Sequence, residues 1–143
     1  SAVHGAWVKG SSAGGNGDAP DLFWTNPQYH FTVRGSDDEV AKQTTLIASL
    51  IQKNRNNRIK IEIGVRIYQS SRPVIGQFNS TSAASLKLVD DSSLHHRREV
   101  SKRFQLSPGH YVIIPYTGKS DQESEFILRL YSEHPAEISQ ATF

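Results

Sequence analysis

The sequence predicts an all-β protein, an antiparallel β-sandwich of about eight strands. Between positions 59 and 67 five aliphatic residues occupy every second position, the period of a strand with one buried face. Further short runs also carry apolar residues at alternate positions, and Gly, Pro, Asn, Asp and Ser separate them. No segment has a persuasive period of 3.6 residues. Short strands that recur between turn signals in this way are typical of a sandwich.

The first half of the chain contains three predicted strands. Pro27 biases Asn26 away from helix and opens an extended run from Gln28 to Arg34. Thr44 to Gln52 is rich in β-branched and aliphatic residues and predicts the second strand. The alternating run from 59 to 67 predicts the third.

The second half begins with a Ser-, Pro- and Gly-rich segment, 70 to 85, which predicts a long loop. After it, apolar residues alternate with charged ones, and Pro108-Gly109 marks a turn before a buried run. Four strands are therefore expected, at 86–89, 100–106, 110–115 and 126–131.

The length of 143 residues allows one hydrophobic core and is too short for two ordinary domains. Because residues 10 to 20 are mostly Gly, Ser and other small residues, they predict a connector. We expect a partly flexible linker at 1–20, the sandwich at 21–134 and a tail at 135–143. The chain starts at Ser1 and lacks Met, so we expect an excised part of a larger protein.

Composition and motifs argue against chemistry within this chain. Without cysteine it has no disulfide, thiolate nucleophile or Cys-ligated zinc. No G-x-S-x-G or H-E-x-x-H motif occurs, and the Gly-rich stretch at 10–17 does not contain or lead directly into G-K-S/T. His95 and His96 are adjacent, so on a strand they point to opposite faces and cannot easily share a metal. No long apolar run or signal peptide appears, and we expect a cytoplasmic protein.

Two acidic clusters are candidate Ca²⁺ ligands. Ca²⁺ takes six to eight oxygens from flexible loops, and carboxylates from two loops at one end of a sandwich would supply them. The alternative is that these residues only solubilise their loops, because no EF-hand motif is present. The candidate ligands are Asp37, Asp38, Glu39, Asp121, Glu123 and Glu125.

A dense basic run at a predicted hairpin is a candidate surface for acidic phospholipid or a protein partner. Each cation near an anionic membrane contributes about 1 kcal/mol before screening. The alternative is a solvated turn that protects a sheet edge. Nucleic acid is not expected, because no stacking aromatic residues or recognition fold accompany the run. The residues concerned are Lys53, Arg55, Arg58 and Lys60.

Six sequence motifs, in the same order along the chain, resemble those of one known family. They are GAWVKGSSAGG, FWTNPQY, LIQKNRNNR, IGVRIYQ, REVSKRFQLSPGHYVIIP and EFILRLYSE. Together, from Gly5 to about Glu133, they resemble domain III of the large subunit of calpain-type cysteine proteases. The resemblance implies a C2-like sandwich that follows the protease core, with the catalytic triad of the hydrolase upstream of this chain. The family's longer acidic loop corresponds here to Ser36 to Glu39.

The resemblance also implies a regulatory function. The acidic loop is expected to contact the upstream protease core of the same polypeptide, with Ca²⁺ or a phospholipid surface competing for those charges. Peripheral membrane association would follow. The alternative is a sandwich that binds a protein partner without dependence on ions or lipid.

Overall fold

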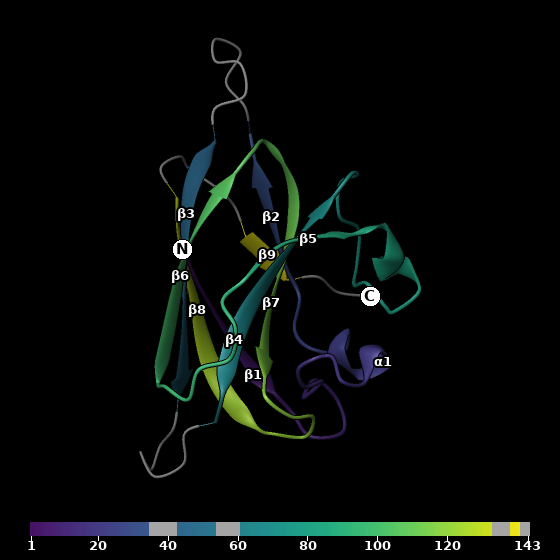
Figure 1. The fold of residues 1–143 in the computed structure, drawn as a ribbon, viewed down its shortest axis with the longest axis vertical. Helices are drawn as coiled ribbons and strands as arrows, with labels where there is room; N and C mark the ends of the chain where they lie inside the picture. Colours follow the sequence, from purple (N-terminus) through teal and green to yellow (C-terminus); the bar gives the residue numbers. More distant parts are fainter. Residues whose placement is uncertain (35–42, 54–60, 133–137, 141–143) are drawn as a thin grey trace.

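The computed structural model is an antiparallel β-sandwich, described here for residues 1–34, 43–53, 61–132 and 138–140, the last three by backbone alone (Figure 1). Nine strands lie in this described part of the chain. They are β1 (Ala2–Trp7), β2 (Tyr29–Val33), β3 (Thr44–Lys53), β4 (Ile63–Ser70), β5 (Lys87–Asp91), β6 (Glu99–Leu106), β7 (Gly109–Thr117), β8 (Ser124–Ser132) and β9 (Ile138–Gln140).

The strands form two sheets in which every described pairing is antiparallel. One sheet has the order β1-β8-β3-β6, and the other has the order β5-β4-β7-β2-β9. Lys102 of β6 lies 3.7 Å from the Asp90 carboxylate of β5. The edges formed by β5 and β6 are therefore on the same side of the sandwich.

The main core lies between the sheets and is made by alternate residues of the strands. In β3, for example, Leu46, Ala48 and Leu50 are fully buried, and β8 contributes Phe126 and Leu128 from the same sheet. Trp7 at the end of β1 packs on Phe126 with ring centroids 4.5 Å apart. This alternation is the pattern that the sequence predicts.

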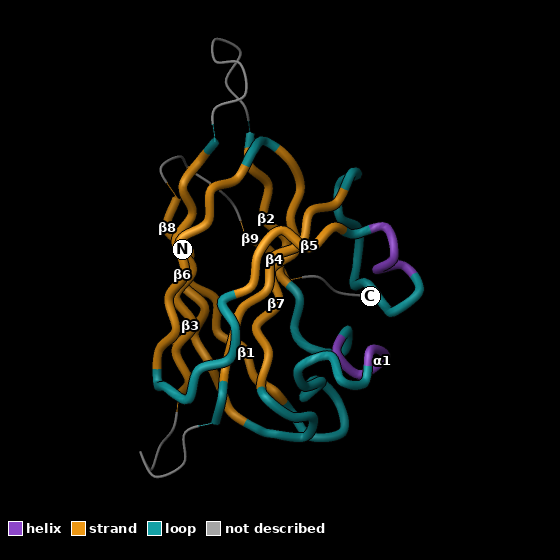
Figure 2. Tube along the Cα trace, viewed as in Figure 1, coloured by secondary structure: helices purple, strands orange, loops and turns teal. Residues whose placement is uncertain are grey.

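A second apolar cluster covers the outer face of the five-stranded sheet. The short helix α1 (Pro20–Phe23) and the long loop with the 3₁₀ helix η1 (Ser82–Ser85) lie on this side (Figure 2). Phe23 of α1 is buried against Val112, Ile114 and Tyr116 of β7. Strand β7 is consequently buried on both faces, which explains its continuous apolar run.

The predicted fold class is confirmed, and the strands lie close to where the sequence places them. Residues 59 and 60 of the strand expected at 59–67 lie outside the described residues, and in the described part of the chain β4 begins at Ile63. No helix in the described part of the chain is long and apolar enough to cross a membrane.

The chain ends differ from the expected linker and tail. Ala2–Trp7 pairs with β8 as a full edge strand, and Trp7 is only 1% exposed. The tail contributes β9, which pairs with β2. Both segments are too short to show a period, and their partners are distant in sequence, so pairing rather than local pattern determines their structure.

Candidate functional site

The acidic residues 121 to 125 lie at the end of the sandwich where β3 ends and β8 begins. Glu125 is directly opposite Lys53 in the pairing of β8 with β3. Asp121 and Glu123 precede β8 in the connection from β7, and both are exposed. One part of the predicted acidic set therefore lies beside the first residue of the predicted basic run.

Two of these carboxylates bind the backbone of the N-terminal turn. The amide N–H of Lys9 donates to Glu123 Oε2 at 3.0 Å, and that of Gly10 donates to Asp121 Oδ1 at 3.2 Å. The N–H of Asp121 donates in return to the carbonyl of Ala13 at 2.9 Å. Asp121 adopts a φ of 65°, which Asp tolerates better than most residues. The loop with Asp121 and Glu123 thus joins residues 9–13 to the entrance of β8.

The glycines of this turn are required by close backbone contacts. Gly15 has a φ of +80°, and a Cβ added there would lie 2.6 Å from the backbone nitrogen of Ser120. Asn26, fully buried, accepts from Gly14 N at 2.9 Å and donates to the Gly15 carbonyl at 3.0 Å. The Gly-rich segment is consequently an ordered part of the site and not the expected connector.

Lys53 interacts with the first strand. Its ammonium donates to His4 Nδ1 at 2.8 Å, which places the proton of a neutral His4 ring on Nε2. Glu125 is exposed next to it. Arg55, Arg58 and Lys60 lie outside the described residues.

The described residues do not by themselves fit a Ca²⁺ ion. They contain no group of three or more His, Asp or Glu side chains placed to hold a metal. Asp37, Asp38 and Glu39 lie outside them. Arg34 and Gln43, which flank that segment, are at the opposite end of the sandwich from Asp121, separated by β3. A strand of ten residues spans about 30 Å, so the geometry does not favour one site built from both clusters.

Two arginines on the outer face of the four-stranded sheet were missed by sequence reasoning. Arg103 of β6 and Arg129 of β8 are exposed, and within the described part of the chain neither forms an ion pair. The signal was available, because each is next to a buried residue in an alternating strand, Phe104 and Leu128. They add cations to the face that carries Lys53.

A third charged group was also missed. Arg66 Nε donates to Asp91 Oδ2 at 2.9 Å, and the guanidinium lies 4.3 Å from the ring centroid of Tyr116 and 4.8 Å from that of Phe23. Tyr116 donates its hydroxyl to Asp91 Oδ1 at 2.6 Å. Burial alone would raise the pKa of Asp91, but the hydrogen bonds from Tyr116, Arg66 and Ser93 outweigh it and lower that pKa. This half-buried group joins β4, β5, β7 and α1.

Fold and site together define a β-sandwich module whose predicted binding groups lie in the loops at its ends. The family model described as calpain large subunit, domain III, matches residues 3–131. The chain therefore belongs to the calpain domain III family, a non-catalytic domain of a cysteine protease family, and it contains no cysteine of its own.

Individual relatives agree. The chain is 38% identical over 138 residues to Calpain-9 of Mus musculus, covering 92% of this chain and 20% of the relative. It is 37% identical over 142 residues to Calpain-A of Drosophila melanogaster, covering 93% and 17%. For the Calpain-2 catalytic subunit of Homo sapiens the identity is 32% over 148 residues, covering 94% and 21%. The chain thus spans about a fifth of the length of these relatives.

A solved structure shares the fold alone. The pre-peptidase C-terminal domain of a collagenase from Bacillus anthracis aligns with a TM-score of 0.51 and 11% identity. The alignment covers 92% of this chain and 88% of that one.

Proposed function

We propose that this chain is the regulatory C2-like domain of an intracellular calpain-type cysteine protease, in which charged loops link effector binding to the position of the protease core. Membership of the domain III family supports the regulatory role. The observation that carries the mechanism is the binding of Asp121 and Glu123 to the backbone of residues 9 and 10.

In this proposal the carboxylates of Asp121 and Glu123 hold the N-terminal turn in place. Hydrogen bonds to a charged acceptor contribute about 1.5–3 kcal/mol each, less where solvent is near. When either carboxylate is neutralised or occupied, Lys9 and Gly10 lose an acceptor and the turn loosens. A protease core that contacts this turn would then change its position relative to the sandwich.

Ca²⁺ is the proposed effector, and its candidate ligands form two separate clusters, one of Asp37, Asp38 and Glu39 and one of the carboxylates at residues 121–125. Amide chemical shifts followed during a Ca²⁺ titration test it. We expect changes at Lys9, Gly10 and residues 121–125, and weaker changes in the double variant Asp121→Asn, Glu123→Gln. The exposed variant Asp18→Asn serves as the matched control. If no amide near either acidic cluster responds up to millimolar Ca²⁺, this part of the proposal fails.

Acidic phospholipid is the second proposed effector. Lys53 and the outward cations Arg103 and Arg129 share one sheet face, and Arg55, Arg58 and Lys60 follow Lys53 in the chain. We expect salt-sensitive co-sedimentation with vesicles that contain phosphatidylserine. The variant Arg55→Gln, Arg58→Gln should bind several-fold less, whereas Lys87→Gln, in β5 of the other sheet, should not. Equal sedimentation with neutral vesicles would contradict it.

One observation favours the alternative of an ion-independent protein-interaction domain. Asp121 and Glu123 already accept hydrogen bonds from the chain itself, as loop-stabilising residues do. This second function would be supported if the chain binds neither Ca²⁺ nor vesicles but does bind the separately expressed protease core. A cytoplasmic location with peripheral membrane association belongs to the first proposal and is tested by cell fractionation.

A further inference from the structure

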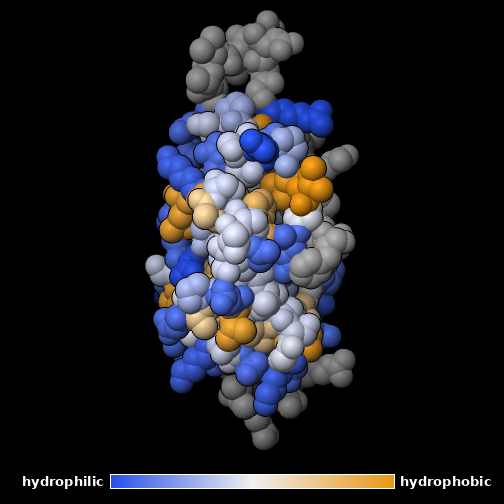
Figure 3. Space-filling view, turned by 90° about the vertical axis from the view of Figure 1, so that its right-hand side faces the viewer, coloured by the Kyte–Doolittle hydropathy of each residue, from blue (hydrophilic) through white to orange (hydrophobic). Residues whose placement is uncertain are grey.

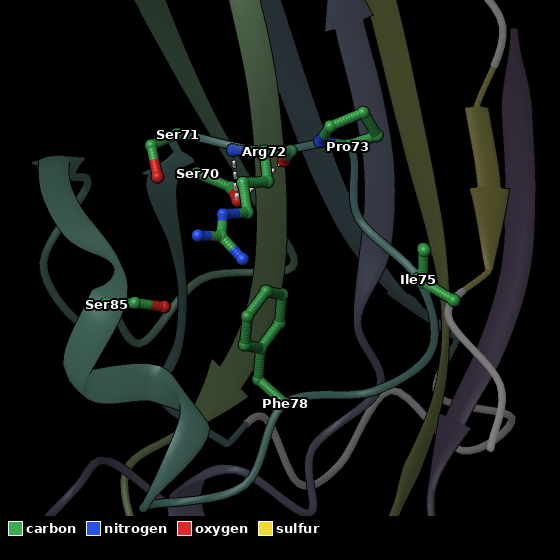
Figure 4. A pocket seen from close by; sticks show the side chains of 7 residues that line it. All are labelled: Ser70, Ser71, Arg72, Pro73, Ile75, Phe78 and Ser85. Carbon is green, nitrogen blue, oxygen red and sulfur yellow. Dashed lines mark hydrogen bonds between the residues drawn. The ribbon is translucent and has the colours of Figure 1, made fainter.

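A pocket of about 450 Å³ lies beneath the long loop on the side of the five-stranded sheet (Figure 4). Its lining includes Ser70, Arg72 and Pro73 at the end of β4, Ile75 and Phe78 in the loop, and Ser85 of η1. The volume is within the range of ordinary ligand pockets. None of the residues used for the mechanism above lines it.

Local hydrogen bonds hold the walls of this pocket in place. Ser70 Oγ donates to the Arg72 carbonyl at 2.7 Å and accepts from Arg72 N at 3.3 Å. The buried Gln28 side chain bonds both the N–H and the carbonyl of Phe78, each at 2.9 Å. Asn79 Oδ1 accepts from Ser82 N at 2.9 Å and so fixes the start of η1. A preformed pocket of this kind loses little conformational entropy when a ligand binds.

The charge in the pocket is uncompensated. Arg72 has no ion-pair or hydrogen-bond partner for its guanidinium within the described part of the chain. Its guanidinium points toward the space between Phe78 and Ser85, and the Ser85 hydroxyl points into the same space (Figure 4). From residue 63 to residue 89 the chain has three cations and no acidic residue, and Arg66 among them is already paired with Asp91.

An apolar rim adjoins this cation. Ile75 is 94% exposed, and Pro73 and Phe78 line the pocket together with Arg72. Leu88 and Val89 of the neighbouring edge strand β5 are 50% and 37% exposed. The space-filling view of this side shows separate apolar patches set among polar atoms (Figure 3).

We propose that this pocket binds an acidic side chain of a partner polypeptide, with an apolar residue next to it in the partner's sequence. The carboxylate pairs with the planar guanidinium of Arg72, whose donors match carboxylate geometry. The apolar neighbour packs on Phe78, Pro73 and Ile75. A membrane surface suits the site less well, because lipid attraction requires several cations and only Arg72 lines the pocket.

The test uses two blocked pentapeptides and the ¹⁵N-labelled chain. Acetyl-Gly-Leu-Glu-Phe-Gly-amide is the probe, and the same peptide with Gln in place of Glu is its neutral match. We expect the acidic peptide to shift amides of residues 70–78 and 85. Arg72→Gln should raise its dissociation constant about tenfold or more, as the loss of one charge-assisted pair predicts. Arg97→Gln, an exposed cation that precedes β6 of the opposite sheet, should leave it unchanged.

Other outcomes overturn the proposal. Equal binding of the neutral peptide would remove the role of the carboxylate, and unchanged binding by Arg72→Gln would remove the role of the guanidinium. Sodium acetate that matches the peptide's affinity would make this a simple anion site. Phosphatidylserine vesicles that shift these amides when the peptide does not would assign it to lipid, and no response to any probe would exclude binding. These results do not depend on the Ca²⁺ and phospholipid proposals, which concern other residues.

Discussion

At the scale of single residues, the Asp91 carboxylate links β5 to β4 and β7. It accepts from Arg66 and Tyr116, and from the backbone N–H of Ser93 at 2.9 Å. The side chains of Arg66 and Asp91 are 20% and 27% exposed, so solvent partly screens the ion pair. The hydrogen bonds therefore account for most of the contribution of Asp91 to stability.

Asp91→Asn should lower the free energy of unfolding by about 1–3 kcal/mol at neutral pH, since it leaves half-buried donors poorly satisfied. Because the folded pKa of Asp91 lies below its unfolded value, the charged carboxylate stabilises the fold above the unfolded pKa of about 3.9. This contribution disappears as pH falls through the lower folded pKa. Urea unfolding at pH 7 and at pH 3 should therefore show a smaller difference between variant and parent at pH 3. A constant difference would contradict this linkage.

The side chain of Asn26 stabilises the N-terminal turn by hydrogen bonds, as that of Asp91 does for β4, β5 and β7. Asn26→Ala removes an acceptor for Gly14 N and a donor for the Gly15 carbonyl in a fully buried position. We expect a loss of about 2 kcal/mol in chemical unfolding. The exposed loop variant Asn79→Ala, whose amide also accepts backbone hydrogen bonds, should cost less than Asn26→Ala. Equal losses would show that the turn is held by something else.

At the scale of elements, edge strand β6 carries a charge on its buried face. Val100, Phe104 and Leu106 point inward, yet Lys102 lies between them, opposite the buried Ala48. An inward-pointing lysine on an edge strand discourages pairing with a second chain. The long Lys102 side chain reaches Asp90 of the other sheet, so its ammonium stays near the surface.

Lys102→Val should change thermal stability little, because an exposed ion pair contributes about 0–1 kcal/mol. It should instead increase aggregation during refolding, measured by light scattering at several protein concentrations. Arg103→Val, which changes the outward neighbour, tests whether any loss of charge has the same effect. Greater scattering for Arg103→Val than for Lys102→Val would contradict the role of the inward charge.

Sequence patterns predicted elements where neighbouring residues alone decide the structure. The alternation of β3, β4, β6 and β8 was visible because each of these strands has one buried face. Strands β1 and β9 were not predicted, because they form by pairing with β8 and β2, which are distant in the sequence.

The candidate site shows the same limit. The acidic residues 121 and 123 were identified, but their bonding to Lys9 and Gly10 was not, because it joins segments more than 100 residues apart. The Gly-rich turn looked like a linker for a related reason. Its glycines are required because the backbone of Leu22 lies close to Gly14 and that of Ser120 lies close to Gly15. No local sequence pattern reveals these contacts.

At the scale of the whole molecule, the sandwich has two apolar layers of different character. The layer between the sheets is formed by inward-facing residues of seven strands, whereas the outer layer depends on loop residues held by Gln28. Gln28 bonds Trp24 of one covering segment and Phe78 of the other. The outer layer should therefore open without global unfolding.

Hydrogen exchange tests this order of opening. Amides of β3 and β8 should be the slowest, and those of residues 70–85 should exchange through a lower-energy opening. Gln28→Ala should speed exchange at 70–85 by about tenfold or more while the exchange of β3 changes less. Uniform acceleration across both sheets would mean that the two layers unfold as one.

The strands β1 and β9 occupy the sheet edges remote from β5 and β6, and each belongs to a different sheet. Neighbouring polypeptide joined to these strands would load the two sheets separately. Each outer strand can peel away one hydrogen bond at a time, so modest force would detach an edge and spare the interior. Tension would then be a mechanical input to this domain, acting at its margins.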